Sequence, residues 1–374
     1  MRGSIRRRGQ TSWEVKFDVP NPDGKRKSRF VTVRGSYKDA QKELTRLLNA
    51  ADEGTLPDPS NSTLAEYLRA WLDGPLGLSP KTLERYRELG ERQIIAHLGS
   101  TKLQKLKPEH IQQWHGTLLG TGLSPRTVGH AHRLLRLVLQ CAVKNNTISR
   151  NVAAVHAPPK VQEREIAILP ADQISDVIAR LEGHALFPIV SLALATGMRR
   201  GELLALQWGD VDLNAATVRV ERSVEETKAG LRIKSPKTKR GRRSITLPPD
   251  AVAMLRAHKV KMLELRLTLG AGNIAPESLV FSSVDGGLLS PDNLSRDWRR
   301  VSSSRKLPRV PFHGLRHTHV SILIRAGVDI LTVSRRLGHN KPSVTLDTYG
   351  HLIEGADASA ADAISKALGA RLLS

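Results

Sequence analysis

Two short segments rich in helix- and strand-breaking residues divide the chain. Thr55–Ser62 has the sequence TLPDPSNS and Ala157–Arg164 has the sequence APPKVQER, and each interrupts regularly patterned sequence. Such proline-rich stretches with little apolar content are typical of linkers. A chain of 374 residues also exceeds what one hydrophobic core usually serves. We therefore expect a multidomain protein with folded parts over residues 1–55, 62–157 and 165–374.

The first part is expected to be a small β-sheet with one helix. Apolar and polar residues alternate over Ser12–Val19 and Ser28–Arg34, and the sequence Asn-Pro-Asp-Gly at 21–24 between them is a turn signal. Ser36 is a suitable N-cap for a helix that runs to about Glu53. The pattern predicts a three-stranded sheet plus this helix.

Basic residues crowd this first part and are interleaved with Trp13 and Phe17. Because strands and turns can enter the major groove of DNA, we expect the basic side chains to contact DNA. The alternative is a solvated surface around a tryptophan of the core. The basic positions are Arg6, Arg7, Arg8, Lys16, Lys25, Arg26, Lys27, Arg29 and Arg34.

The second part is expected to be all helical over Thr63–Asn151. Two of its helix starts are alike: Leu78–Thr82 and Leu123–Thr127 each place Ser before Pro and a basic residue, Lys81 or Arg126, in the first turn. Since helix N-termini bind phosphate, both starts are candidate anchors for a DNA backbone. Simple capping explains the same spacing equally well.

The third part is expected to be a mixed α+β domain that is mainly helical. Lys228–Arg243 carries eight basic residues and no acidic one between strand-like segments, which predicts a basic hairpin. The expected helices span 171–181, 184–196 and 200–206, the expected strands lie near Val211, at 217–222 and at 244–247, and further helices follow to the end.

The net charge of +22 suits a polyanionic partner: DNA, RNA or an acidic membrane. A membrane is the weakest candidate, since the longest apolar run, Leu186–Ala195, is shorter than the roughly 18 residues that span a bilayer. The basic N-terminus lacks the apolar stretch of a secretory signal, and the single Cys141 fits a reducing compartment. We expect a cytoplasmic protein.

Five fragments of the third part carry residues suited to phosphate chemistry. They are Thr196–Leu203 (TGMRRGEL), Pro236–Lys239 (PKTK), His313–His317 (HGLRH), Leu337–His339 (LGH) and Asp347–Gly350 (DTYG). In this order and at these separations they resemble the tyrosine recombinases, the family of phage lambda integrase. The specific match covers about residues 168–351. The helical part resembles the core-binding domain of integrases by layout, and the N-terminal part resembles their arm-binding domains by pattern.

The resemblance implies a catalytic set. The family's nucleophile falls on Tyr349, and Glu202 matches its acidic supporting position. The family's hairpin lysine falls on Lys237, with Lys239 as a rival because the register of the loop is open. Lys239 and Arg240 are also expected to contact DNA. The implied catalytic residues are Arg199, Lys237, His313, Arg316, His339 and Tyr349.

The chemistry of a phosphodiester fits this set. Guanidinium groups stay charged and give paired hydrogen bonds to the non-bridging oxygens while the pentavalent transition state gains charge. A tyrosine, with a pKa of about 10 in water, needs help to become nucleophilic, and we expect His313 to supply it. The family's hairpin lysine protonates the leaving 5′ oxygen, and His339 is then expected to donate to the phosphate.

No cofactor or metal is expected. A covalent phosphotyrosine keeps the bond energy, so religation needs neither ATP nor a metal, and the sequence has no carboxylate triad or P-loop. His313, His317 and His319 are close enough in sequence to suggest zinc, but no Cys or His-Glu-x-x-His partner accompanies them. We expect His317 and His319 to be packing or surface residues.

An apolar stripe after Tyr349 predicts a C-terminal helix. This helix could pack on its own domain, whereas the resemblance implies that it docks into a neighbouring protomer and links four subunits in a ring on two DNA duplexes. We favour docking, because a terminal helix with an apolar face needs a partner. The stripe is formed by Ala360, Ile364, Ala367, Leu368 and Leu372.

The resemblance thus implies a site-specific recombinase, an integrase that cleaves and rejoins DNA through a 3′-phosphotyrosine to integrate or excise a mobile element. The implied partners are double-stranded DNA with core-type and arm-type sites, a directionality factor and a DNA-bending protein, and the implied location is the nucleoid. A type IB topoisomerase-like enzyme and a non-catalytic DNA-binding regulator are the alternatives.

Overall fold

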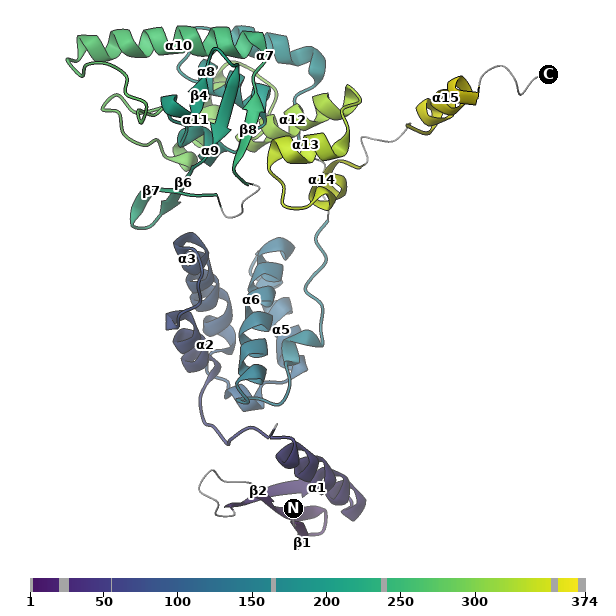
Figure 1. Cartoon of the computed structure of the whole chain (residues 1–374). Helices are drawn as coiled ribbons and strands as arrows, with labels where there is room; N and C mark the ends of the chain where they lie inside the picture. The colour runs from purple at the N-terminus through teal and green to yellow at the C-terminus, as the bar shows by residue number, and fades with distance from the viewer. Residues whose placement is uncertain are drawn as a thin grey trace. The chain divides into compact units, whose positions relative to one another are not determined.

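The computed structural model describes residues 3–19, 27–54, 56–162, 166–236, 241–350 and 356–368, and it divides into two compact units, residues 1–163 and 164–374 (Figure 1). The first unit holds two separate hydrophobic clusters, and the second holds a large cluster and a small one. None of the helices in the described ranges is long and apolar enough to cross a membrane.

The first unit begins with an antiparallel sheet of order β1-β2-β3 and one helix. The bounds are Gly3–Gly9 for β1, Ser12–Val19 for β2, Lys27–Arg34 for β3 and Tyr37–Asp52 for α1. Alternation along β2 buries Val15 and Phe17 in a cluster that α1 shares. Ser36 caps α1 in a capping box with Asp39. The predicted strands and helix are confirmed, and the turn at 21–24 lies outside the described residues.

The rest of the first unit is helical, as predicted. Its elements are α2 (Leu64–Asp73), α3 (Pro80–Leu89), a π-helical turn (Gly90–Ile95), α4 (Ala96–Leu98), a 3-10 turn (Leu103–Lys105), α5 (Pro108–Gly120), α6 (Pro125–Lys144) and a 3-10 turn (Val152–Ala154). Leu68, Ile94, Trp114 and Leu135 are buried in its core. This core is separate from the cluster under the N-terminal sheet.

The second unit is mainly helical with two small sheets. Its elements are a 3-10 turn (Ala171–Gln173), α7 (Ile174–Leu181), α8 (Phe187–Thr196), α9 (Arg200–Leu204), a 3-10 turn (Trp208–Asp210), β4 (Val211–Asp212), β5 (Thr217–Val220), β6 (Ser223–Thr227), β7 (Gly230–Lys234), β8 (Arg243–Thr246), α10 (Pro249–Thr268), α11 (Pro291–Ser304), α12 (Phe312–Arg325), α13 (Ile330–Leu337), α14 (Pro342–Tyr349) and α15 (Ala356–Leu368).

The hairpin of this unit differs from the prediction. We expected the basic stretch Lys228–Arg243 to form it, but β6 pairs with β7 and the hairpin closes at Gly230, whose φ of 118° favours glycine. β8 pairs with β5 in the other sheet, whose order is β4-β5-β8. β7 and β8 therefore belong to two different sheets.

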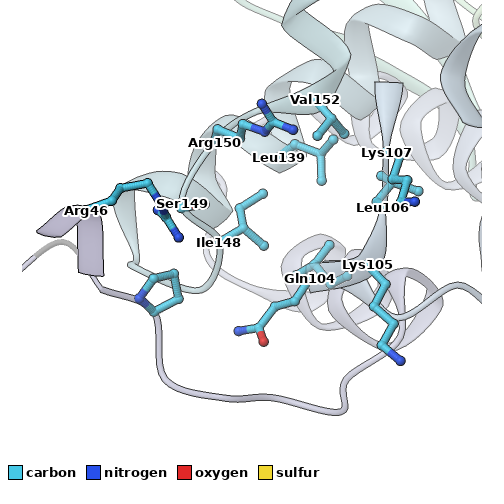
Figure 2. Close-up of a pocket in the computed structure, with 12 residues that line it drawn as sticks. Arg46, Gln104, Lys105, Leu106, Lys107, Leu139, Ile148, Ser149, Arg150 and Val152 are labelled. Atoms are coloured by element: carbon cyan, nitrogen blue, oxygen red, sulfur yellow. The ribbon is translucent and has the colours of Figure 1, made fainter. Parts of the chain in front are cut away.

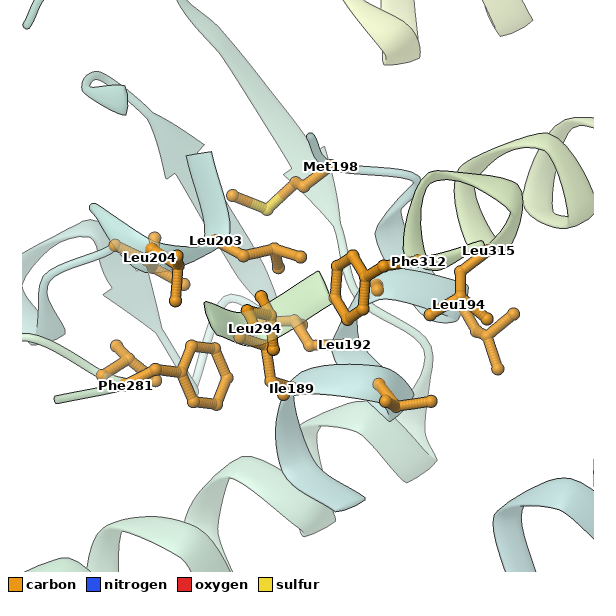
Figure 3. Packing of buried hydrophobic residues seen from close by; sticks show 14 of the residues in the cluster. Ile189, Leu192, Leu194, Met198, Leu203, Leu204, Phe281, Leu294, Phe312 and Leu315 are labelled. Carbon is orange, nitrogen blue, oxygen red and sulfur yellow. The ribbon is translucent and has the colours of Figure 1, made fainter. Parts of the chain in front are cut away.

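The large core brings the sequence motifs together. α8 is apolar on nearly every side, and it packs centrally against α12. Figure 3 shows Leu192 of α8 next to Phe312 of α12 and Leu194 of α8 next to Leu315 of α12, and Leu203 of α9 belongs to the same cluster. This packing fixes the helix that carries HGLRH beside the α8–α9 junction that carries the first arginine motif.

The small cluster joins the last helices of the motif region. Val320 of α12, Val333 and Leu337 of α13 and Tyr349 of α14 are buried in it. It holds the predicted nucleophile against the helix that carries Arg316. In α15, by contrast, the side chains that the structure describes are exposed, including Ile364 at 60 % and Leu368 at 54 %.

Candidate active site

The turn between α8 and α9 positions the first arginine. Gly197 ends α8 with a φ of 65°, and a Cβ there would lie 2.6 Å from Cδ2 of His319, so backbone and space both require glycine. Arg199 then becomes the N-cap of α9. Its backbone N–H and Nη1 donate to the Glu202 carboxylate at 2.9 and 2.7 Å. Its side chain is 41 % exposed, which leaves the guanidinium accessible to a ligand.

Glu202 organises two arginines. It is 5 % exposed, and Arg243 of β8 donates to it from Nη2 at 2.8 Å. Burial alone would raise the pKa of Glu202, but the hydrogen bond and charge of Arg243 and the charge of Arg199 outweigh burial and lower the pKa to about 2. Arg243 was not among the predicted site residues. It stood within the noted basic run, but nothing local shows which basic residue meets a carboxylate 41 positions away.

Arg316 is held at the centre of the cluster and is 4 % exposed. Nη1 donates to the carbonyl oxygen of Gly197 at 2.7 Å, and Nη2 donates to that of Leu337 at 2.9 Å. Burial and the charge of Arg199 lower the pKa of Arg316 to about 9, which leaves the guanidinium positively charged at neutral pH.

His339 follows Gly338 at the end of α13 and contacts Arg316. Its Nε2 lies 3.0 Å from Nη2 of Arg316, and its Nδ1 lies 2.7 Å from Oγ1 of Thr345. A guanidinium can only donate, so Nε2 accepts and Nδ1 carries the proton. Burial and the charge of Arg316 lower the pKa of His339 to about 4, which makes it neutral. We expected His339 to donate to the phosphate, but in this state its Nε2 has no proton to give.

Tyr349 is the last residue of α14 and is 3 % exposed. Its hydroxyl oxygen lies 2.5 Å from Nδ1 of His317. Burial raises the pKa of Tyr349 to about 12, although Arg316 acts to lower it. The phenol therefore keeps its proton at neutral pH, and its O–H donates a hydrogen bond to Nδ1 of His317.

His317, which we expected to be a packing or surface residue, is half-buried and contacts the predicted nucleophile. Sequence analysis assigned the help for Tyr349 to His313, and the structure gives the contact to His317, four residues later on α12. The rings of His313 and His317 are 4.9 Å apart. The four-residue spacing of His313 and His317 could have shown this, because residues four apart lie on the same face of a helix. A site that includes one of them is therefore close to the other. His319 does have the packing role that we predicted: it is buried, with Nδ1 on the carbonyl of Leu194.

His313 lies in the first turn of α12 and is exposed. Partial desolvation of the imidazole and the charges of His317, Arg316 and Arg199 lower the pKa of His313. Lys237, Lys239 and Arg240 lie outside the described residues.

In the described part of the chain, no group of three or more His, Cys, Asp or Glu residues is placed to hold a metal ion.

Arginines line two hollows beside the histidines of this cluster. The hollow next to His339 has a volume of about 370 Å³, and the one next to His313 has a volume of about 680 Å³. Sequence analysis did not single out their arginines, which are dispersed along the chain. They are Arg242, Arg243 and Arg335 in the first hollow, and Arg200, Arg299 and Arg309 in the second.

Most described basic residues of the N-terminal sheet are exposed to solvent, and Arg8 among them also pairs with Glu14 at 2.7 Å. The exposed ones are Arg6, Arg7, Arg8, Lys16, Lys27 and Arg34. Arg29 differs, because its Nη1 donates to the carbonyl of Pro57 at 2.8 Å and its Nη2 pairs with Asp58. In this state Arg29 is not available for a phosphate. Lys25 and Arg26 lie outside the described residues.

The two matched helix starts behave differently. Oγ of Ser124 accepts from the Thr127 N–H at 3.2 Å, which is simple capping, whereas Ser79 makes no such bond. Lys81 and Arg126 are both exposed.

A hollow that we did not predict, of about 940 Å³, also lies in the first unit. Figure 2 shows Lys105, Lys107 and Arg150 among the residues around it, with Leu139 and Ile148 on its apolar lining. The dispersed positions of these cations gave no sequence signal.

Comparison with known proteins shows the family of the chain. Residues 168–355 match the phage integrase family, and residues 63–119 match the N-terminal SAM-like domain of phage integrases. An integrase of Streptomyces ambofaciens is 30 % identical over 350 residues, which cover 88 % of this chain and 86 % of that protein. The chain therefore belongs to the phage integrase family of tyrosine recombinases.

Two solved structures share the fold. The Tn1549 transposon integrase, in complex with a circular intermediate DNA, aligns with a TM-score of 0.69 at 18 % identity and covers 81 % of this chain and 100 % of that chain. A lambda integrase tetramer bound to a Holliday junction aligns with a TM-score of 0.57 at 19 % identity and covers 90 % and 92 %. The predicted family and its mostly helical, multidomain fold with small sheets are confirmed.

Proposed function

We propose that the chain integrates or excises a mobile element by cleaving and rejoining DNA through a 3′-phosphotyrosine at Tyr349. As a tyrosine recombinase it is a site-specific DNA strand transferase. The observation that carries the proposal is the cluster in the second unit. Glu202 there orients Arg199 and Arg243, and Arg316 is buried between the Gly197 turn and His339.

Each residue of the cluster has a role in the proposed reaction. Arg199 and Arg316 bind the non-bridging oxygens and stabilise the charge that grows in the transition state. The oxygen of Tyr349 attacks phosphorus, and the hairpin lysine of the family, Lys237 or its rival Lys239, protonates the leaving 5′ oxygen. Arg316 and Tyr349 are 4 % and 3 % exposed, so substrate binding has to uncover them before reaction.

All three parts of the chain are proposed to act on DNA. Residues 1–55 bind arm-type sites, residues 62–157 bind core-type sites and residues 165–374 catalyse. Separate hydrophobic cores under the sheet and in the helical part support this division. The exposed cations of the sheet and the arginine-lined hollows near His313 and His339 supply positive charge for the phosphates.

A tetramer on two DNA duplexes is the proposed active assembly. The exposed apolar side chains of Ile364 and Leu368 on α15 suit docking into a neighbouring protomer. The lambda integrase that shares the fold was solved as a tetramer on a Holliday junction. A directionality factor and a DNA-bending protein complete the proposed set of partners, and the nucleoid in the cytoplasm is the proposed location.

A covalent adduct tests the proposal. The protein is incubated with a nicked suicide duplex that carries its attachment site, and denaturing gels detect protein joined to the 3′ phosphate. We expect an adduct with the wild type and none with Tyr349→Phe, because phenylalanine lacks the attacking oxygen. An adduct with Tyr349→Phe, or none with the wild type, would contradict the proposal.

The alternatives predict different results. A type IB topoisomerase-like enzyme would relax supercoiled DNA that lacks an attachment site. A regulator would keep its full biological effect in Tyr349→Phe.

A further inference from the structure

We propose that His317 is a further catalytic residue, which accepts the proton of Tyr349 as the phenol oxygen attacks phosphorus. The proposal rests on the proposed function, since it requires Tyr349 to be the nucleophile. It reassigns to His317 the help for the tyrosine that the sequence had suggested for His313.

Geometry is the first support. Nδ1 of His317 lies 2.5 Å from the hydroxyl oxygen of Tyr349, a direct contact that is close enough for proton transfer without a bridging water. His317 directly follows Arg316 on α12. One rigid helix therefore sets the position of the guanidinium that binds phosphate and of the imidazole that meets the nucleophile.

The protonation state is the second support. The phenol holds its proton, so Nδ1 of His317 must present its lone pair, and the ring carries its hydrogen on Nε2. Burial and the charge of Arg316 lower the pKa of His317, which keeps the imidazole neutral at physiological pH. His317 is thus already in the form that can take a proton.

The nearby histidines have other contacts in the described structure. Both ring nitrogens of His339 are engaged, by Arg316 and Thr345. Both ring nitrogens of His319 are engaged as well, by the carbonyl of Leu194 and by Nε of Arg336. The exposed His313 packs edge to face on the ring of His317 at 4.9 Å, and this contact helps to fix the orientation of the His317 ring.

The proposed step balances as follows. The bond between phosphorus and the Tyr349 oxygen forms, the bond between phosphorus and the 5′ oxygen breaks, and the phenol proton moves to Nδ1 of His317. The leaving 5′ oxygen takes its proton from a separate acid, for which Lys237 is proposed. In religation the 5′ hydroxyl attacks phosphorus and returns its proton to the group that had acted as the acid, the tyrosine oxygen leaves, and His317 returns the proton to it.

The test separates proton acceptance from hydrogen bonding. In His317→Asn, the amide oxygen can take the place of Nδ1 as an acceptor, but it cannot accept a proton; His317→Ala removes both properties. We expect both variants to form the phosphotyrosine adduct about 100-fold more slowly, or worse, in single-turnover assays. Core-site binding and the thermal midpoint of His317→Asn should stay close to those of the wild type.

A sulfur substitution identifies which side of the reaction is affected. A suicide duplex with a bridging 5′-phosphorothiolate has a leaving group that needs no acid. We expect this duplex to restore cleavage by Lys237→Ala, the matched control, but not by His317→Asn or His317→Ala. Recovery of the His317 variants on this duplex would place His317 on the leaving-group side and overturn the proposal.

The pH profile supplies a second readout. The charged and titratable groups facing His317 are His313 and Arg316 on α12 and Tyr349 on α14. The wild-type rate should fall as pH drops through the pKa of His317, below its ordinary value, and this fall should be absent from the residual rate of His317→Asn.

Two further results would also overturn the proposal. A His317→Asn rate within a few-fold of wild type would reduce His317 to a positioning contact. A wild type that forms no adduct on either duplex would refute the proposed function itself, and this outcome is distinct from failure of the His317 variants alone.

Discussion

A single buried carboxylate controls the charge balance of the site. Glu202 accepts hydrogen bonds from Arg199 and Arg243, and its pKa of about 2 shows how strongly these cations hold it ionised. An ionised group whose pKa is lower in the folded protein than in the unfolded chain stabilises the fold above its unfolded pKa. That stabilisation is lost as pH falls toward the folded value.

Glu202→Gln should therefore change how stability depends on acid. Between the ordinary glutamate pKa of 4.5 and the folded value of about 2, the unfolded wild type binds a proton that the folded wild type does not. The wild type should lose about 3 kcal/mol more than Glu202→Gln over this range, at 1.36 kcal/mol per pKa unit. Urea unfolding at a series of pH values measures the difference. Parallel curves for the two proteins would show that Glu202 is not held ionised.

Arg316→Lys should abolish most cleavage while sparing DNA binding. A lysine ammonium cannot reproduce the planar fork that contacts the carbonyls of Gly197 and Leu337 together. We expect a loss of about 100-fold to 1,000-fold in single-turnover cleavage. Mobility shifts on core-site DNA, which depend on many cations, should change by only a few-fold. Equal loss of binding and cleavage would mean that Arg316 acts as a general DNA contact.

Residue types and motif order were predictable from the sequence, but the partners of the residues were not. The resemblance marked Glu202 as the acidic supporting position, and the structure shows that this carboxylate accepts from Arg199, three residues before it. Arg243 and His317 enter the cluster through tertiary packing of β8 and α14. Local pattern carries no information about such long-range pairs.

At the scale of elements, the α8–α9 turn supports the whole site. Gly197 gives α8 its end, leaves room for His319 and offers its carbonyl to Arg316. The predicted hairpin shows the limit of sequence patterns for elements. The sequence pattern marked β5 and β8, which do pair, but it did not mark β6 and β7, the two strands between them that form the hairpin.

Gly197→Ala should destabilise the second unit by more than backbone strain alone. A left-handed residue other than glycine costs roughly 1–2 kcal/mol, and here the Cβ would also meet His319 at 2.6 Å. Gly286→Ala is the matched control, since Gly286 has a φ of 82° with nothing within 4 Å of the added Cβ. In urea unfolding, Gly286→Ala should lower the free energy of unfolding by the backbone cost alone. This variant should cleave DNA at the wild-type rate. Equal effects of the two substitutions would disprove the clash.

At the scale of the whole molecule, positive charge is spread over parts with different proposed tasks. The N-terminal sheet exposes Arg6, Arg7 and Arg8. Replacing the three with Gln should weaken binding to arm-type DNA, and each lost phosphate contact should reduce the slope of log K against log salt by about 0.9. Cleavage of an isolated core site should remain. Equal loss of both activities would contradict the modular division of the chain.

The apolar face of α15 should matter for assembly and not for the stability of one chain. Ile364 and Leu368 are 60 % and 54 % exposed, so replacing both with Glu removes little buried surface and should leave the unfolding midpoint of the free protein unchanged. If α15 docks into a neighbour, two buried charges would oppose that contact, and tetramers on paired DNA sites should be lost in sedimentation while single-site cleavage continues. Val284→Glu, at a position 73 % exposed in the same unit, is the matched control and should assemble normally. Normal tetramers from the α15 double variant would place the assembly contact elsewhere on the protein.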